Sequence, residues 1–382
     1  MKLIHLSDLH IGKRVNEFSM LEDQRYILKQ ILDITDREQA DGGLVAGDIN
    51  DKPVPPAEAV QVFDEFLTCL AEKKIPVFAV SGNHDSPERV AFGARLMRGQ
   101  GVHLSPVYDG TVTRVSMEDK YGEVVIHLLP FVKPAVVRHV FEEAEAASYQ
   151  DAVKIAVEHM NLDTGKRNVL VAHQFVTGAF RCDSEEVLVG GMDNVDVSIF
   201  DSFDYVALGH IHSPQHVGRE TVRYCGTPLK YSFSEAEQEK TVTVVELKAK
   251  GMVEIRTIPL LPLRDMRRIR GTYLQVTALD FYRNTNQEDY VQVTLTDEED
   301  VPDGMQKLRV IYPNLMRLEY DNKRTRDSRE VTGACGVEKK SGLELFEEFY
   351  ELQNNQPMSE TQKAFVEKLM ENIQGRSCQR SN

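Results

Sequence analysis

Five short polar motifs in the first 212 residues offer the side-chain types that bind divalent metal ions. Carboxylate oxygens, an amide oxygen and imidazole nitrogens together suit two divalent ions, each of which needs five or six ligands including water. The motifs are Asp8-Leu9-His10, Gly47-Asp48-Ile49-Asn50-Asp51, Gly82-Asn83-His84-Asp85, Ala172-His173 and Gly209-His210-Ile211-His212.

The spacing within the motifs fits a shared centre. Asp8 and His10 stand two residues apart at an extended strand end, so their side chains point the same way, and His210 and His212 repeat this geometry. Asp48 can offer one carboxylate oxygen to each of two ions held roughly 3.5–4 Å apart. Such a pair polarises a phosphoester and activates a water molecule for attack on phosphorus.

Each motif alone is weak evidence. A GNH tripeptide is usually a turn, and histidines near strand ends are more often hydrogen-bonded structural residues than metal ligands. Five motifs in order, each directly after an apolar stretch, favour a metal centre over five unrelated structural residues.

The surrounding pattern predicts an α/β domain with two sheets that ends near residue 262. Short apolar runs read as buried strands, and α/β folds place their active sites at the carboxyl ends of such strands. The strands are expected at 2–7, 43–47, 76–82, 168–173 and 204–210, with helices near 20–40, 56–74, 87–99 and 135–160 and further strand-like segments at 111–129 and 217–259.

The rest of the chain divides into smaller parts. Residues 263–320 read as a small α/β unit with strands at 273–279 and 290–297, followed by a helix and a strand. A polar, charged linker is expected at 321–342. Helices are expected at 343–374, before a polar tail at 375–382.

The composition limits location and partners. No apolar run reaches about 18 residues and the N-terminus lacks a secretory pattern, which predicts a cytoplasmic protein. The five cysteines are scattered and are expected to be reduced thiols. A net charge of −15 argues against DNA binding by bulk electrostatics, since phosphate neutralisation needs Lys and Arg.

Local basic residues could still meet a nucleic acid. Lys13, Arg14 and Arg89 follow the first and third motifs and could reach phosphates, although solvated surface charge is the commoner role. Arg264, Arg267, Arg268 and Arg270 form the densest basic cluster, which could line a DNA path or be a solvated linker.

The five motifs resemble those of the calcineurin-like metallophosphoesterase superfamily. Within it, the chain is similar to the SbcD family, the nuclease subunits of bacterial SbcCD complexes. The segments that carry this likeness are MKLIHLSDLHIGK, GNHDSPER, GHIHSPQ, GTPLKYSFSEAEQEK, YVQVTLTDEEDVPDGMQKLRVIYPNLMRLEY and LELFEEFYELQNNQPMSE. The resemblance implies a two-sheet αββα sandwich flanked by helices, a small α/β capping domain that faces DNA, and C-terminal helices.

The resemblance also implies site roles. Asp8, His10, Asp48 and His212 would hold one divalent ion, and Asp48, Asn83, His173 and His210 the other, with Mn²⁺ the expected metal. We expect His84 to protonate or stabilise the leaving oxygen. The Asp51 carboxylate either orients His84 or caps a turn. Asn50 stands where relatives commonly carry an aromatic or aliphatic residue, so local packing there is expected to differ.

Two apolar stripes in the C-terminal helices could dock a partner or pack back on their own domain. The resemblance favours docking to the coiled-coil base of an SbcC-type ATPase, within a heterotetramer that contains a homodimer of this chain. The stripe residues are Leu343, Phe346, Phe349, Tyr350, Phe365 and Leu369.

Three functions from different classes follow. The first is a DNA nuclease subunit in repair, recombination and replication, acting as exonuclease on double strands and endonuclease on single strands or hairpins. The second is a phosphoesterase of nucleotides or other small molecules, which would not need residues 265–382. The third is a scaffold with an inactive site, which the complete ligand set disfavours.

Overall fold

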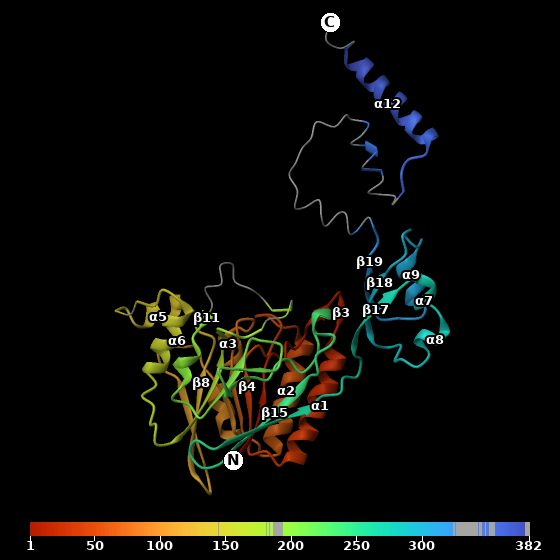
Figure 1. Cartoon of the computed structure of the whole chain (residues 1–382). Helices are drawn as coiled ribbons and strands as arrows, with labels where there is room; N and C mark the ends of the chain where they lie inside the picture. Colours follow the sequence, from red (N-terminus) through yellow and green to blue (C-terminus); the bar gives the residue numbers. More distant parts are fainter. Residues whose placement is uncertain are drawn as a thin grey trace. The chain divides into compact units, whose positions relative to one another are not determined.

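In the computed structural model, the described residues are 1–143, 145–180, 182, 184–185, 194–323, 325, 343, 346–347, 349–350 and 356–378, with side chains up to Leu369 in the last helix. The chain forms two compact units, residues 1–266 and 267–382 (Figure 1). Sequence patterning placed their boundary near residue 262. Within the described residues, no helix is long and apolar enough to cross a membrane.

The first unit contains two six-stranded sheets. One has the order β16-β15-β1-β4-β5-β6, in which β1, β4, β5 and β6 are parallel and β15 and β16 are antiparallel neighbours. Its strands are β1 (Lys2–Leu6), β4 (Gly42–Ala46), β5 (Val77–Val80), β6 (Val102–Leu104), β15 (Thr241–Leu247) and β16 (Val253–Pro259).

The other sheet has the order β13-β14-β12-β9-β8-β7, with the four inner strands parallel and an antiparallel strand at each edge. Its strands are β7 (Thr113–Asp119), β8 (Gly122–Leu129), β9 (Arg167–His173), β12 (Tyr205–Gly209), β13 (Gln215–Val217) and β14 (Arg219–Tyr224). Inner strands such as β9 and β12 are buried along their whole length, whereas the edge strand β7 alternates between half-buried and exposed side chains.

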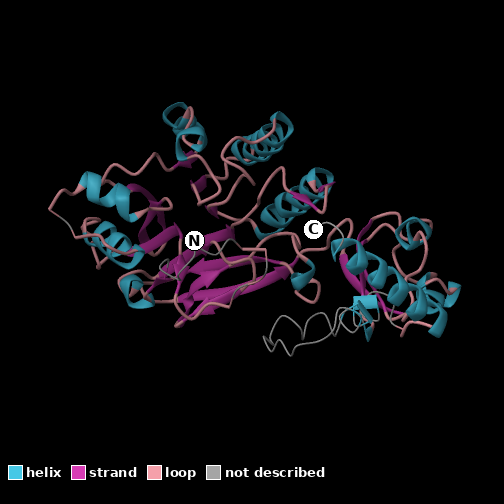
Figure 2. Ribbon diagram, turned by 90° about the horizontal axis from the view of Figure 1, so that it is seen from above, coloured by secondary structure: helices cyan, strands magenta, loops and turns pink. Residues whose placement is uncertain are grey.

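The two sheets pack face to face through one apolar core. Leu44 and Phe78 of the first sheet belong to the same buried cluster as Val169 and Tyr205 of the second. Helices flank the strands (Figure 2), among them α1 (Leu21–Glu38), α2 (Ala57–Glu72), α5 (Pro134–Val140) and α6 (Tyr149–Glu158). This arrangement confirms the predicted two-sheet sandwich.

Two predicted helices are interrupted. The stretch expected at 87–99 is α3 (Pro87–Val90), α4 (Ala94–Met97) and a 3-10 turn at Arg98–Gln100, because Gly93 adopts a left-handed conformation with φ 74°. The stretch at 135–160 is two helices, since Ser148 and Asp151 form a capping box that begins α6 anew.

The second unit has a three-stranded sheet, β17-β18-β19. Its strands are β17 (Met266–Gly271), β18 (Tyr290–Leu295) and β19 (Leu315–Tyr320), with the short helices α7 (Tyr273–Val276), α8 (Leu279–Tyr282) and α9 (Gly304–Arg309). The strand predicted at 273–279 is therefore wrong. Thr272 and Gln275 form a capping box that starts a helix there, and residues 266–271 supply the strand instead.

The C-terminal predictions are only partly covered. The linker at 321–342 and the second half of the tail at 375–382 lie mostly outside the described residues. The last helix, α12 (Glu360–Cys378), continues beyond residue 374, where the sequence pattern predicted its end.

Candidate metal centre

The five motifs follow five parallel strands, so they meet at one edge of the sandwich. β1, β4 and β5 of the first sheet and β9 and β12 of the second all end at this edge. Main-chain hydrogen bonds join the first two motifs, since Asp8 N and His10 N donate to the carbonyls of Gly47 and Asp48 at 3.0 and 2.9 Å. The first sheet meets the second where His173 Nδ1 lies 2.8 Å from the carbonyl oxygen of Ala46.

Three glycines make this convergence possible, and sequence analysis gave them no role. A Cβ on Gly209 would overlap the carbonyl oxygen of Ala46 and lie 2.7 Å from His173 Nδ1. A Cβ on Gly82 would overlap the Asp48 carboxylate. A Cβ on Gly47 would overlap the His173 ring. These glycines, which precede Asp48, Asn83 and His210, therefore set how closely the strand ends can approach.

Four predicted ligands adopt a left-handed backbone conformation that non-glycine residues rarely take. The φ angles are 51° at Asp8, 43° at His10, 47° at Asp48 and 106° at His210. Each such residue costs of order 1–3 kcal/mol and persists where the surroundings over-determine it. Strain of this kind concentrates at functional sites, and here the positive φ angles direct the candidate ligand side chains toward a common centre.

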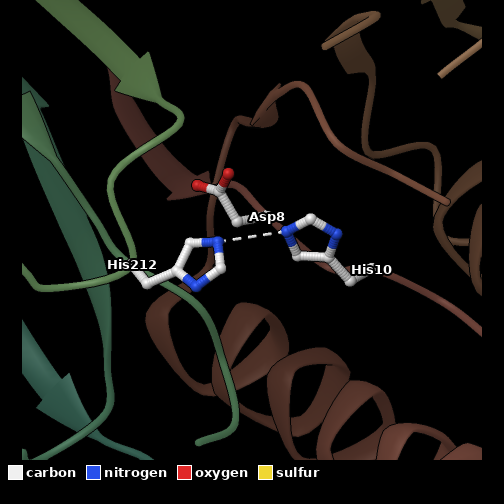
Figure 3. A group of neighbouring side chains, drawn as sticks. All are labelled: Asp8, His10 and His212. Atoms are coloured by element: carbon white, nitrogen blue, oxygen red, sulfur yellow. Dashed lines mark hydrogen bonds between the residues drawn. The ribbon is translucent and has the colours of Figure 1, made fainter. Parts of the chain in front are cut away.

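One group of ligand atoms contains Asp8, His10 and His212 (Figure 3). Their candidate ligand atoms all lie within 4.8 Å of one another, and the three residues are buried. His10 Nε2 and His212 Nε2 are 3.1 Å apart. Two imidazole nitrogens at this distance must share a proton or a cation, because two lone pairs would repel.

A second group surrounds the Asp48 carboxylate. Asp48 Oδ2 lies 3.3 Å from His173 Nε2 and 3.7 Å from His10 Nε2, so it touches both groups. The Asn83 Oδ1 atom is 3.0 Å from His173 Nε2 and 3.0 Å from His210 Nδ1. The structure thus brings together all seven predicted ligands in a set of oxygen and nitrogen donors, which fits borderline divalent ions.

Burial and mutual charge shift the titration of these groups. Burial, reinforced by the neighbouring Asp48 carboxylate, raises the pKa of Asp8 to about 8. Burial opposes the charged form of His173, but Asp48 and then Asp8 outweigh it and raise the pKa of His173 to about 9. Burial holds the pKa of His10 well below its usual range.

Metal binding is expected to release about one proton or more at pH 7, because an ion requires Asp8 ionised and His173 neutral. Both pKa values are raised in the metal-free protein, so the apparent affinity for Mn²⁺ should increase from pH 6 to pH 9. Calorimetric titration in buffers of different ionisation enthalpy measures the released protons. An enthalpy of binding that is the same in every buffer would contradict this expectation.

His84 belongs to a third group, in which its ligand atom lies within 4.8 Å of those of His10 and Asp48. Its ring packs edge-on against His10, and its Nδ1 lies 3.1 Å from the main-chain oxygen of Asp51. Because a carbonyl only accepts, Nδ1 carries a proton, and Nε2 lies 3.9 Å from Asp48 Oδ2. The prediction that the Asp51 carboxylate orients His84 is wrong, because the main-chain oxygen of Asp51 makes that contact. The carboxylate binds Lys13 Nζ at 2.8 Å instead.

Asp85 ties the second and third motifs together, a role that sequence analysis missed. Its buried carboxylate accepts hydrogen bonds from the main-chain nitrogens of Ile49, Asn50 and Gly82 at 2.9–3.0 Å. The Asn50 side chain donates a further bond to it at 3.3 Å. The unusual polar residue at position 50 therefore has a partner in the motif that follows.

Asp85→Asn is expected to lower the free energy of unfolding by roughly 2–4 kcal/mol. The amide group turns one acceptor into a donor and leaves buried N–H groups without a charged partner. Denaturant unfolding compares this variant with Asp33→Asn, an exposed change on α1. Equal unfolding midpoints for the two variants would rule out the anchoring role.

Most of the predicted DNA-contact cations are engaged with neighbours. Lys13 binds Asp51 as described, and the Arg14 guanidinium donates to the carbonyl of Glu17. Arg89 lies in α3 beside Asn50, where both line the same cavity of about 690 Å³.

The basic cluster at 264–270 is largely neutralised by carboxylates. In the first unit Arg264 pairs with Asp23 at 2.7 Å and with Glu22. In the second unit the pairs are Arg267 with Asp289 at 2.6 Å and Arg270 with Asp321 at 2.5 Å. Arg268 is exposed. Three of the four arginines of the cluster are thus paired with carboxylates, which leaves little unpaired positive charge for a DNA path.

Comparisons with known proteins agree with this geometry. Residues 1–214 match the model of the calcineurin-like phosphoesterases, and residues 262–354 match that of the type 5 capsule protein repressor C-terminal domain. The SbcD subunit of the nuclease SbcCD from Staphylococcus epidermidis is 31% identical over 374 residues, which cover 97% of this chain and 98% of that protein.

Two of the solved structures that resemble this chain cover about two thirds of it. A protein of Thermus thermophilus has a TM-score of 0.37 at 11% identity, covering 67% of this chain and 98% of its own. A dimetal phosphatase from Danio rerio has a TM-score of 0.40 at 12% identity, covering 68% and 99%. On the strength of the family model over its first 214 residues and of the full-length relative, the chain belongs to the calcineurin-like phosphoesterases and, among them, to the SbcD family of SbcCD nuclease subunits.

Proposed function

We propose that this chain is the nuclease subunit of an SbcCD-type complex, which hydrolyses phosphodiester bonds of DNA in the cytoplasm with two divalent metal ions. Double-strand exonuclease and single-strand or hairpin endonuclease activities are both expected, with Mn²⁺ as the metal. The observation that carries the proposal is the convergence of seven candidate ligand residues, one of which is the central Asp48. The relative that matches nearly the whole chain is named a nuclease subunit.

We assign the donors to two ions that share Asp48. Asp8, His10 and His212 would complete the first ligand set, in keeping with their mutual approach within 4.8 Å. Asn83, His173 and His210 would complete the second, since Asn83 Oδ1 lies 3.0 Å from a nitrogen of each histidine. Bound ions at these positions would polarise the phosphodiester and lower the pKa of the attacking water.

The protein's own groups then position the substrate and handle the leaving oxygen. His84 Nδ1 donates to the Asp51 carbonyl, which fixes the ring, and in the doubly protonated imidazolium the Nε2–H group would donate its proton to the leaving 3′ or 5′ oxygen. Lys13, held 2.8 Å from the Asp51 carboxylate, places a cation near the same point. We propose that Lys13, Arg14 and Arg89 contact DNA phosphates close to the metals.

The acidic chain needs help to hold DNA. Its net charge is −15, and Arg264 and Arg267 are already paired with carboxylates. Exposed Arg268 stays a candidate for a DNA contact in the small α/β unit. We therefore propose that an SbcC-type ATPase partner supplies most of the positive DNA-binding surface.

Apolar side chains of the C-terminal helices support docking of that partner. Phe349 and Phe365 are 57% and 66% exposed, and Phe346 and Leu369 are 38% and 47% exposed. Leu343 and Tyr350 are half-buried.

We also propose a homodimer, in keeping with Phe92 and Leu96 of the α3–α4 region, which are 84% and 86% exposed. Contiguous exposed apolar patches mark protein interfaces, so these side chains are the candidates for the two contacts.

The test is cleavage of a labelled DNA hairpin and of single-stranded DNA by the full chain, with Mn²⁺ and with a chelator. Mn²⁺-dependent cleavage is the expected result, with double-strand exonuclease activity added by the ATPase partner and ATP. A protein that hydrolyses bis-p-nitrophenyl phosphate but cleaves no DNA, with or without the partner, would be a small-molecule phosphoesterase instead.

A further inference from the structure

A buried ionic cluster lies directly behind His212, at the opposite end of the ring from the candidate metal position. Glu235, in the 3-10 turn Phe233–Glu235, has no exposed surface, and Lys240 Nζ binds its Oε2 at 2.5 Å. Thr227 Oγ1 is a further donor to Oε2 at 3.3 Å, and Tyr231 N donates to Oε1 at 3.3 Å. A buried carboxylate with this many donors is held in one orientation.

Ser184 connects that carboxylate to the His212 ring. Its Oγ lies 2.6 Å from Glu235 Oε1 and 2.7 Å from His212 Nδ1. An ionised carboxylate only accepts, so the hydroxyl hydrogen of Ser184 goes to Glu235. The Ser184 oxygen must then accept from His212, and the ring carries its proton on Nδ1.

The main chain of His212 is held by the same cluster. Its carbonyl oxygen accepts from Lys240 Nζ at 2.9 Å, and its amide donates to Glu185 Oε1 at 2.7 Å. The ring and both polar main-chain atoms of this one residue are therefore fixed by side chains from two distant segments. With Nδ1 protonated, the lone pair of Nε2 faces His10 Nε2, 3.1 Å away.

We propose that Glu235, acting through the Ser184 hydroxyl, is a positioning residue that fixes the tautomer and ring orientation of His212 and so sets the affinity of the ion held by Asp8, His10 and His212. The inference rests on the proposed metal site and adds to it residues that none of the five motifs contains. Removal of such an orienting partner typically lowers metal affinity by about 10- to 100-fold. The hydrogen bonds from Glu235 through Ser184, here called the relay, end on His212. The ion beside Asn83, His173 and His210 should therefore keep its affinity.

Mn²⁺ titration of the metal-free full chain, followed by electron paramagnetic resonance and calorimetry, tests the proposal without any activity measurement. In Ser184→Ala one of the two ions should bind about 10- to 100-fold more weakly, while the other binds as in the wild type. Ser184→Thr keeps the hydroxyl and should restore the affinity. Glu235→Gln should resemble Ser184→Ala, and Glu237→Gln, an exposed change in the same segment, serves as the matched control.

The outcomes separate the relay from the metal site itself. If the wild type binds two ions and folded Ser184→Ala binds both as tightly, the relay is overturned and the proposed function stands. Equal weakening of both ions would show a general structural effect and would also overturn it. If the wild type binds no Mn²⁺, the proposed metal-dependent function fails first. If Glu235→Gln does not fold, the comparison of Ser184→Ala with Ser184→Thr tests the proposal without it.

Discussion

His84→Ala is expected to reduce kcat for DNA hairpin cleavage by about 10²- to 10⁴-fold, the usual contribution of a positioned general acid. His84 Nδ1 is occupied by the Asp51 carbonyl, so Nε2 is the atom left to protonate a leaving oxygen. The ring packs edge-on against His10 without being part of the assigned ligand sets, so both metal ions should bind as in the wild type. Single-turnover cleavage at saturating Mn²⁺, together with Mn²⁺ titration, measures the two quantities.

Substrates with different leaving groups distinguish a general-acid role of His84 from a purely structural role. A sugar alkoxide needs a proton as it departs, whereas p-nitrophenolate does not, so hydrolysis of bis-p-nitrophenyl phosphate should fall far less in His84→Ala. His216→Ala, an exposed change on β13, is the matched control and should leave both rates unchanged. Equal losses on the two substrates would argue that His84 only supports the site.

Asp48→Asn is expected to lower kcat/KM by more than about 10³-fold and to weaken both ions, because the shared carboxylate loses its charge. The amide oxygen can still accept the hydrogen bond from His84 N, which spans 2.9 Å in the wild type, so the local fold should survive. Loss of the carboxylate also removes a main cause of the raised pKa of His173, which should return toward its ordinary value.

Metal stoichiometry and activity are measured together for this variant. Asp64→Asn on α2 provides a control change of the same chemistry, and it should bind two ions and cleave DNA normally. Excess Mn²⁺ should fail to restore Asp48→Asn, since Asp48 is the carboxylate assigned to both ligand sets. Full recovery at high Mn²⁺ would mean that Asp48 is not shared.

The convergence of the candidate ligands could be predicted because its signal is local. Each ligand follows an apolar strand, and parallel strands place their carboxyl ends at one edge, so Asp8 and His173 meet although they are far apart in sequence. The strand wrongly predicted at 273–279 shows the limit of periodicity, because a capping box at Thr272 outweighs a short alternating pattern. The alternating pattern predicts a strand and the capping box predicts a helix, and the sequence alone does not show which of the two determines the structure.

Other features depend on pairs that local patterns do not reveal. The Arg264 guanidinium pairs with Asp23 of α1, 241 positions earlier, so the sequence could not show that this arginine is neutralised. The carboxylate of Asp51 binds Lys13, and its main-chain carbonyl accepts a hydrogen bond from His84. The residue type alone cannot predict which of the two groups contacts which partner. Glu235 reaches His212 through Ser184, and the likeness of the segment at 226–240 to the SbcD family does not reveal that contact.

The close approach of Gly209 to the Ala46 carbonyl limits how small an autonomous catalytic fragment of this protein can be. At this point the end of β12 passes directly against the end of β4, and each sheet contributes its own share of the candidate metal donors. Neither sheet can be excised and still present a usable pair of ligand sets. The shortest fragment worth constructing therefore contains both sheets through β15 and β16, and any circular permutation should open the chain away from this seam.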